Sequence, residues 1–228
     1  MEYSKIDKLG VNPSLLGFGC MRFPKKEDGT IDEVEAERML DHAIESGVTY
    51  IDTAYPYHDG ESEPFVGRVL KKYKREDFYL ATKLPMFKID SLEQAKEIFE
   101  EQIKRLDVDY VDFYLLHALN KDTWKKVIDL NIIPYCEELK KQGRIKNFGF
   151  SFHDDYEVFE EIINYRDWDF CQIQLNYIDT DIQAGMKGYK LTEEKNVPLV
   201  IMEPIKGGAL ASLSDDIEKV FTDYNQKC

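Results

Sequence analysis

Residues 79–116 read YLATKLPMFKIDSLEQAKEIFEEQIKRLDVDYVDFYLL, and this stretch contains two apolar runs separated by an amphipathic one. The second run, Tyr110–Leu116, is mostly apolar, as expected of a strand in a parallel sheet that helices cover. Along Ser91–Leu106 the apolar residues recur at steps of three or four, which predicts a helix with one buried face. Together with the run at Tyr79–Thr82, the stretch predicts a strand, a helix and a second parallel strand.

The same alternation continues toward both ends of the chain, and no linker rich in glycine, serine or proline interrupts it. We therefore expect one domain over residues 1–228. The predicted strands are Leu15–Gly17, Tyr50–Asp52, Tyr79–Thr82, Tyr110–Leu116, Asn147–Ser151, Phe170–Leu175 and Pro198–Met202. The predicted helices are Asp32–Ser46, Ser62–Lys72, Ser91–Leu106, Thr123–Gln142, Asp154–Tyr165, Ile182–Asn196 and Asp215–Tyr224.

Strand–helix units in series fit either an open, doubly wound sheet or a closed barrel. An open sheet that binds dinucleotides normally carries G-x-G-x-x-G after its first strand. Here residues 17–22 read GFGCMR and lack the third glycine. We therefore favour an α/β fold of the TIM type, a (β/α)8 barrel, whose chemistry lies at the C-terminal ends of the strands.

Composition excludes several classes of partner. The 228 residues include 44 Asp and Glu against 30 Lys and Arg, so the formal net charge is −14. This acidity, without a basic cluster, argues against binding to nucleic acid or to anionic membranes. The N-terminus reads MEYSKIDKLG and resembles no export signal, and no apolar run is long enough to span a bilayer, so we expect a cytoplasmic protein.

Four cysteines stand far apart along the chain, without a C-x-x-C pair. This spacing indicates reduced thiols and offers no zinc or iron–sulfur site, so we expect no metal. The cysteines are Cys20, Cys136, Cys171 and Cys228.

Polar residues follow three successive predicted strands. Asp52, Lys83 and His117 come at or just after the strand ends, and Tyr57 lies in the loop beyond Asp52. Each residue alone has an ordinary explanation, as a cap, a solvated charge, a structural histidine or a loop aromatic. Together they would form a proton-donating group, because a buried ammonium lowers the pKa of a neighbouring phenol, which is about 10 in water. The carboxylate would keep that ammonium charged.

Five sequence motifs resemble, in the same order, those of the aldo-keto reductase family. They are IDTAYPYHDGESE (51–63), LATKLP (80–85), YLLHAL (114–119), GRIKNFGFS (143–151) and CQIQLNY (171–177). Two further segments, GFGCMRFP (17–24) and MEPIKGGAL (202–210), resemble a bacterial branch whose longer members often add a C-terminal ferredoxin-like module. We expect no such module within residues 1–228.

The resemblance implies a barrel that reduces aldehydes or ketones to alcohols with NADPH or NADH. It marks Tyr57 as the general acid, Lys83 as the group that eases proton release, Asp52 as the partner of Lys83, and His117 as the residue that orients the substrate oxygen. The D-T-A-x-x-Y spacing selects Tyr57 over its neighbour Tyr55. Such chemistry needs an acid with a pKa nearer neutrality than that of free phenol.

The resemblance also implies a cofactor site, with NADP as the expected cofactor and NAD as the alternative. Ser151 and Gln172 match the side chains that hydrogen-bond the nicotinamide. Phe152 and Met202 stand where many relatives have Asn and Tyr, and Lys206 would have to offset the charge of Glu203 near the phosphates. The full set is Gly19, Cys20, Met21, Asp52, Ser151, Phe152, Gln172, Met202, Glu203, Ile205 and Gly207.

Residues 203–228 provide only a loop and one helix. We therefore expect about seven strand–helix units, an incomplete barrel without its eighth unit, and a chain that is truncated at its C-terminus. The first and seventh strands would then each present an unpaired edge, and such edges pair readily with another chain. The sequence thus predicts self-association through the open side.

Three functions remain open at this point. The first is a carbonyl reductase acting on a small-molecule aldehyde or ketone. The second is a catalytically impaired barrel that serves as a binding or regulatory subunit. The third is a metal-dependent hydrolase using His58, His117 and Glu203, which is the weakest because these residues lack the usual spacing of metal ligands.

Overall fold

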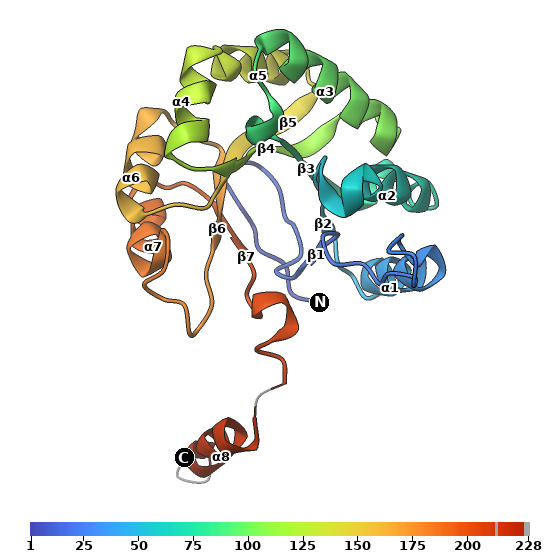
Figure 1. Ribbon diagram of the computed structural model, residues 1–228, viewed down its shortest axis with the longest axis vertical. Coiled ribbons are helices and arrows are strands. Elements are labelled where there is room, and N and C mark those ends of the chain that lie inside the picture. Colours follow the sequence, from blue (N-terminus) through green and yellow to red (C-terminus); the bar gives the residue numbers. More distant parts are fainter. Residues whose placement is uncertain (213, 226–228) are drawn as a thin grey trace.

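The computed structural model describes residues 1–212 and 214–225. Seven parallel strands form one curled sheet in the order β1 to β7, so each strand pairs with its neighbours along the chain (Figure 1). The helices lie on the outside of the curled sheet (Figure 1). The strands are β1 Gly17–Gly19, β2 Tyr50–Asp52, β3 Tyr79–Leu84, β4 Val111–Leu119, β5 Ile145–Phe152, β6 Phe170–Gln174 and β7 Leu199–Met202.

The connections between strands contain α-helices and short 3-10 turns, and η4 and α8 follow the last strand. The α-helices are α1 Glu33–Glu45, α2 Ser62–Leu70, α3 Leu92–Leu106, α4 Lys121–Asp129, α5 Ile132–Lys141, α6 Tyr156–Tyr165, α7 Gly185–Glu194 and α8 Asp215–Asn225. The 3-10 turns are η1 Tyr57–Gly60, η2 Arg75–Asp77, η3 Met86–Lys88 and η4 Lys206–Gly208. Cys228 and its two preceding residues lie outside the described residues.

The α/β fold and its parallel sheet confirm the predicted class, with corrections at several boundaries. β1 begins two residues later than predicted, because Leu15 and Leu16 are exposed and pairing with β2 starts at Gly17. The single helix predicted over Thr123–Gln142 is wrong: α4 ends before Asn131, whose φ of 55° interrupts the helix. A φ in this region belongs to the left-handed conformation, which asparagine tolerates better than most residues.

Two apolar cores lie on the two sides of the sheet. The larger one joins the outer strand faces to the helices, and the rings of Phe99 on α3 and Tyr114 on β4 meet there at 5.3 Å. The smaller one fills the interior, where Phe113 packs edge-on against Phe170 at 4.9 Å. Val11, from the N-terminal hairpin, packs against this inner cluster. The interior is thus closed at the N-terminal ends of the strands, which leaves the opposite rim for a site.

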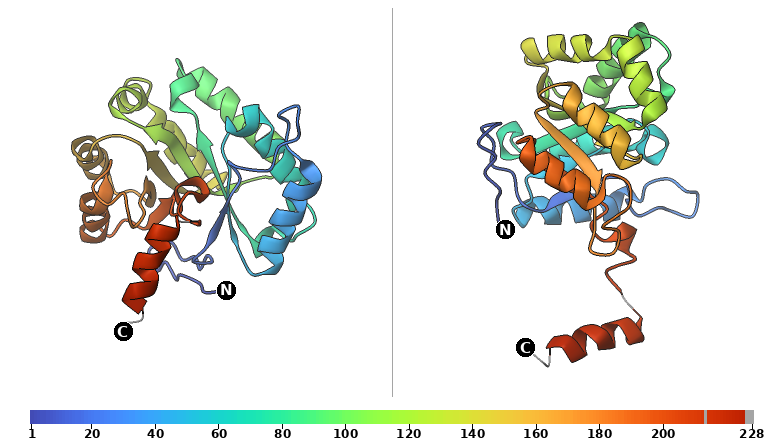
Figure 2. Two further views of the ribbon diagram at one scale, coloured as in Figure 1. Left: turned by 60° about the horizontal axis from the view of Figure 1, so that its bottom comes forward. Right: turned by 90° about the vertical axis from the view of Figure 1, so that its left-hand side faces the viewer.

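The sheet ends at β1 and β7, and among the described residues each of these strands pairs on one side only. Apolar side chains lie exposed next to these edges, including Leu15 beside β1 and Ile201 on β7. Helix α8 stands away from the rest of the chain in Figure 1 and in the right-hand view of Figure 2. No helix among the described residues has the length and apolarity needed to cross a membrane.

We expect Gly149→Ala to destabilise the fold by about 1–3 kcal/mol, because extra atoms in a filled space force the backbone to shift. A methyl group at Gly149 would overlap the carbonyl oxygen of Phe170 and lie 2.8 Å from its ring. Gly19→Ala is the matched control, since nothing lies within 4 Å of a methyl group built there. Urea unfolding measures both, and equal stabilities would contradict the expectation.

Candidate active site

Three of the predicted residues meet around one buried amine. Lys83 Nζ lies 2.5 Å from Asp52 Oδ1 and also donates to the Thr53 carbonyl oxygen at 2.9 Å. It lies 3.3 Å from Tyr57 Oη, within hydrogen-bond distance. The side chain of Lys83 is 1% exposed, so its charge depends on these three oxygens instead of on water. The structure therefore brings Asp52, Tyr57 and Lys83 together.

Strand register explains why these residues meet. Asp52 pairs with Ala81, and Lys83 lies two residues further along β3; Lys83 pairs with Leu115, and His117 lies two residues further along β4. Side chains two apart on a strand share a face. The side chains of Asp52, Lys83 and His117 thus lie in a diagonal row on the interior face of the sheet. Lys83 and His117 lie within β3 and β4, and not after them as predicted. Pairing of β3 with β4 includes Lys83, and β4 resumes its pairing with β5 at Leu119, after an irregularity that contains His117.

Tyr57 reaches this row from η1, directly after β2. The next residue, His58, has a φ of 51°, and this left-handed conformation turns the chain back over the rim. The ring of Tyr57 meets the ring of His117 edge-on at 5.8 Å. The Lys83 amine also lies 5.0 Å from the centre of the Tyr57 ring.

Burial and the neighbouring charges together decide the protonation of Lys83 and Tyr57. Burial alone would lower the pKa of Lys83, but Asp52 and Tyr57 outweigh it and the pKa is raised, so the amine stays charged. For Tyr57, burial raises the pKa above its usual value and Lys83 only partly opposes this. The expectation that the pKa of Tyr57 lies below that of free phenol is therefore wrong. Tyr57 holds its proton at neutral pH and can donate it.

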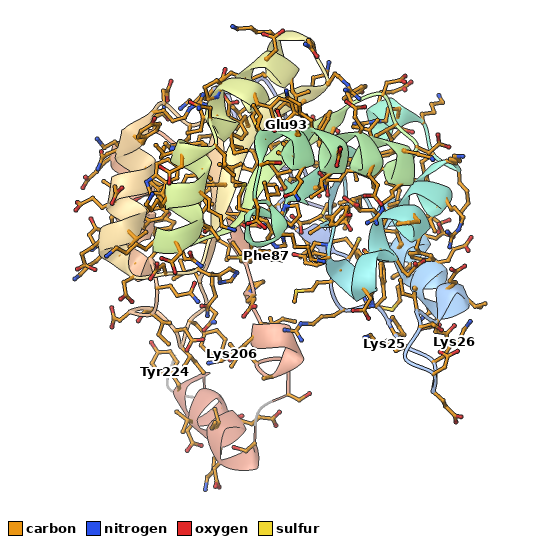
Figure 3. All side chains as sticks on the ribbon, turned by 45° about the horizontal axis from the view of Figure 1, so that its top comes forward. Lys25, Lys26, Phe87, Glu93, Lys206 and Tyr224 are labelled. Atoms are coloured by element: carbon orange, nitrogen blue, oxygen red, sulfur yellow. The ribbon has the colours of Figure 1, made fainter. Side chains whose placement is uncertain are left out.

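His117 is neutral at physiological pH. Burial, with the nearby charge of Lys83, lowers its pKa from 6.5 to about 3. Its Nδ1 atom is buried and has no hydrogen-bond partner among the described residues. The ring also packs at 5.6 Å from the ring of Phe87, which is 47% exposed on the rim (Figure 3). Phe87 belongs to the site by position, yet nothing in the sequence marks it.

Gln172 on β6 and Ser151 on β5 extend the site across the interior. Gln172 Nε2 donates to the second oxygen of Asp52 at 3.2 Å, whereas its Oε1 atom is buried without a partner in the described chain. Ser151 Oγ accepts from the backbone N–H of Ala118 at 2.8 Å. The two residues pair in register and face the same interior. A buried amide oxygen without a donor fits a ligand that supplies an N–H.

Of the other predicted cofactor residues, those in the turn after β1 lie beside the site, whereas Phe152 faces away from it. Cys20 is buried, and its N–H donates to the Asp52 carbonyl oxygen at 2.8 Å, which places the Gly19–Met21 turn beside the site. Phe152 does not face the interior: its ring packs at 5.2 Å against Phe159 on α6, because the alternation along β5 that turns Ser151 inward turns Phe152 outward.

Residues 202–207 continue from the end of β7 along the rim. Met202 ends the strand, Glu203 has a φ of 56°, and Ile205 is 49% exposed. Lys206, which would have to offset the charge of Glu203, instead pairs with Asp179 at 2.8 Å.

A buried polar network, which the sequence did not predict, contacts the backbone of Lys83. Glu63 on α2 is fully buried, and its Oε1 atom accepts from Thr82 Oγ1 at 2.6 Å and from Gln102 Nε2 at 2.8 Å. Gln102 also donates to the Lys83 carbonyl oxygen at 3.0 Å. The network fixes the backbone of β3 at Lys83. The network joins α2, α3 and β3. Contacts between separate elements of this kind cannot be predicted from residue spacing along the sequence.

No group of three or more His, Cys, Asp or Glu side chains in the described part of the chain could hold a metal ion. His58, His117 and Glu203 therefore do not form a ligand cluster. His58 Nε2 instead accepts a hydrogen bond from the Phe23 N–H at 3.1 Å.

The lowered pKa of His117 makes stability depend on pH. Between pH 6.5 and about 3 the unfolded chain binds a proton at His117 that the folded chain does not, so the free energy of unfolding falls as the pH is lowered. We expect His117→Asn to reduce this slope, as measured by urea unfolding between pH 6.5 and 4. The other acidic and histidine residues are common to both proteins. Identical slopes would show that His117 titrates normally.

The chain matches the sequence profile of the Aldo/keto reductase family over residues 15–227. It is 32% identical over 155 residues to "Probable aldo-keto reductase 1" of Glycine max, a match that covers 64% of this chain and 44% of the plant protein. It is 24% identical over 203 residues to the NADH-specific methylglyoxal reductase of Escherichia coli, a match that covers 78% of this chain and 60% of that enzyme.

Among solved structures, aldo-keto reductase AKR11C1 from Bacillus halodurans in its holo form superposes with a TM-score of 0.70 and 30% identity, covering 88% of this chain and 65% of that chain. This chain thus spans less than two thirds of the length of each of these three proteins. Because the profile match covers nearly all of the sequence, and the parallel sheet has the matching architecture, this chain belongs to the aldo-keto reductase family.

Proposed function

We propose that this chain reduces a small aldehyde or ketone to an alcohol with a nicotinamide cofactor. The observation that carries the proposal is the buried Lys83 amine, held by Asp52 at 2.5 Å and within 3.3 Å of the Tyr57 hydroxyl. A protonated phenol beside a fixed cation suits one task in particular, which is donation of a proton to an oxygen that gains negative charge.

The chemistry follows from these contacts. A bound nicotinamide supplies the hydride. Tyr57 gives its proton to the carbonyl oxygen, and the adjacent Lys83 ammonium stabilises the phenolate that remains. Asp52 keeps Lys83 charged in an interior that excludes water. His117 is neutral, so it orients the carbonyl oxygen by a hydrogen bond without adding a second positive charge.

The interior fits the nicotinamide end of such a cofactor. Gln172 Oε1 is buried without a donor, and Ser151 faces the same space from the neighbouring strand. These two side chains would hold the carboxamide, and the turn after β1 and the segment from Met202 to Gly207 would line the remainder. The name of the Escherichia coli relative supports a nicotinamide cofactor and a small carbonyl substrate. We propose NADP as the cofactor, with NAD as the alternative.

A non-catalytic subunit gains no support from the site. Burying an ion pair carries a desolvation penalty, and an apolar pair of similar size would stabilise the fold as well or better. A role as scaffold alone therefore does not explain why these charges are buried. The pair of Asp52 and Lys83 is instead complete and directed at Tyr57.

We expect Tyr57→Phe to lower the rate of carbonyl reduction by about 10²–10⁴-fold, because the general acid is removed. The oxidation of NADPH and NADH, followed with a panel of aldehydes and ketones, measures the rate. Tyr55→Phe is the matched control, since the Tyr55 hydroxyl donates to Glu101 at 2.8 Å, outside the site. A Tyr57→Phe variant with the wild-type rate would remove the basis of the proposal.

We also propose that copies of the chain associate through the open side of the sheet. The single-sided pairing of β1 and β7 and the exposed Leu15, Leu16 and Ile201 support this, because free strand edges and apolar surface favour pairing with another chain. Light scattering at micromolar concentration should give a mass above that of one chain. A stable monomer would count against the association.

A further inference from the structure

The loop that carries Tyr57 has a strained backbone. Directly after Tyr57, three successive residues are left-handed, with φ of 51° at His58, 57° at Asp59 and 97° at Gly60. Residues other than glycine rarely adopt this conformation, and it persists only where surrounding contacts hold it. The position of the Tyr57 hydroxyl therefore depends on what holds this loop.

Arg105 on α3 contacts the loop on both sides of Tyr57. Its Nη1 atom donates to the carbonyl oxygens of Tyr55 at 3.4 Å and of Gly60 at 3.5 Å. Its Cζ atom lies 4.2 Å from the centre of the Tyr55 ring, and a methyl group built on Gly60 would lie 3.3 Å from Nη1. These contacts use the ring and the backbone of Tyr55, which Tyr55→Phe leaves in place. The guanidinium thus packs closely against the loop.

The charge of Arg105 faces a buried carboxylate. The Arg105 side chain is 22% exposed, and its Nη1 atom lies 3.6 Å from Oε2 of Glu63. That oxygen is buried and has no hydrogen-bond partner among the residues that the structure describes. Toward the surface, Nη2 of Arg105 donates to Glu101 at 2.7 Å. The planar fork of an arginine can serve several acceptors at once, whereas a lysine amine is a single point charge.

The same helix also holds Lys83. Gln102 lies three residues before Arg105 on α3, so the two side chains share a face of the helix. Its amide nitrogen donates to the Lys83 carbonyl oxygen at 3.0 Å and to Glu63 Oε1 at 2.8 Å. Glu63 therefore links the two, with one oxygen toward Gln102 and the other toward Arg105. Helix α3 is thus in contact with the strand that carries the amine and with the loop that carries the phenol.

We propose that Arg105 is a positioning residue for the proposed reduction. It holds the Tyr57 loop against α3, the helix that also holds Lys83, and so keeps the Tyr57 hydroxyl 3.3 Å from the Lys83 amine. Arg105 acts through Tyr57, because α3 lies outside the curled sheet and the site lies inside it (Figure 1). This inference rests on the proposed function, since it requires a reaction in which Tyr57 donates a proton.

The first test measures carbonyl reduction by Arg105→Met, which keeps a long side chain but removes every donor. It should lower kcat about 10–100-fold, because a displacement of about 1 Å at a reacting group has effects of this size. The affinities for NADPH and NADH, titrated by fluorescence, should equal those of the wild type. Arg105→Lys should recover part of the rate. Lys104→Met is the matched control, since Lys104 is the exposed neighbour on the same helix, and it should keep the wild-type kcat.

A second variant guards against a loss of folding. Arg105→Met leaves the Glu63 carboxylate buried without its cation, which is destabilising. The double variant Arg105→Met/Glu63→Gln removes both charges. It should therefore unfold at a higher temperature than Arg105→Met, as followed by circular dichroism, and its kcat should still be low.

Combination with Tyr57→Phe separates positioning from a general disturbance of the site. If Arg105 acts through Tyr57, Arg105→Met should cause no further loss of rate in the Tyr57→Phe background, because residues that act as a unit are not additive. An undiminished further loss there, or a wild-type kcat in Arg105→Met or in the double variant, would overturn the role of Arg105 alone. A wild-type chain that reduces no carbonyl compound would overturn the proposed function together with this role.

Discussion

The buried ion pair of Lys83 and Asp52 is the constraint around which the site is built. An ammonium that is 1% exposed is tolerated only with close oxygen partners, and removing one partner of such a pair typically costs about 3–5 kcal/mol. β2 must therefore deliver Asp52 beside β3. Gln172 holds the second carboxylate oxygen, and Gln102 holds the backbone of Lys83 from behind. Much of the polar interior thus serves one charge, and that charge acts on Tyr57.

Sequence patterns locate the strands better than they locate the strand ends. The run Tyr50–Asp52 matches β2 at both ends, because the apolar run stops at Asp52, where the strand also ends. β3 continues through Lys83, where a polar residue ends the apolar run but not the pairing, and β4 continues past His117 to pair again at Leu119. In the same way, the periodicity of Thr123–Gln142 hides the break between α4 and α5, which is a matter of backbone conformation.

In the site too, some residues can be predicted from the sequence and others depend on how the elements pack. Motif spacing is enough to predict that Tyr57 and Lys83 lie near one another. Tyr57 lies in the turn shortly after β2, and Lys83 lies near the end of the adjacent strand β3. It cannot reveal Phe87 beside His117, or Glu63 beneath β3, because these contacts depend on how separate elements pack. Nor can it give the protonation of Tyr57, where burial and a nearby cation act in opposite directions and only the surroundings decide which is larger.

The lengths of the strands imply a gradient of local opening across the molecule. β4 and β5, of nine and eight residues, are paired on both sides, whereas β1 has three residues and a single partner. Backbone amides in the middle of the sheet should therefore exchange with solvent far more slowly than those at its two margins. Lys83 and His117 sit on the slow, rigid centre, while Gly19 and Met202 sit on the margins. For the proposed reduction, the residues that transfer the proton would thus stay fixed while the surfaces that admit and release a long ligand fluctuate.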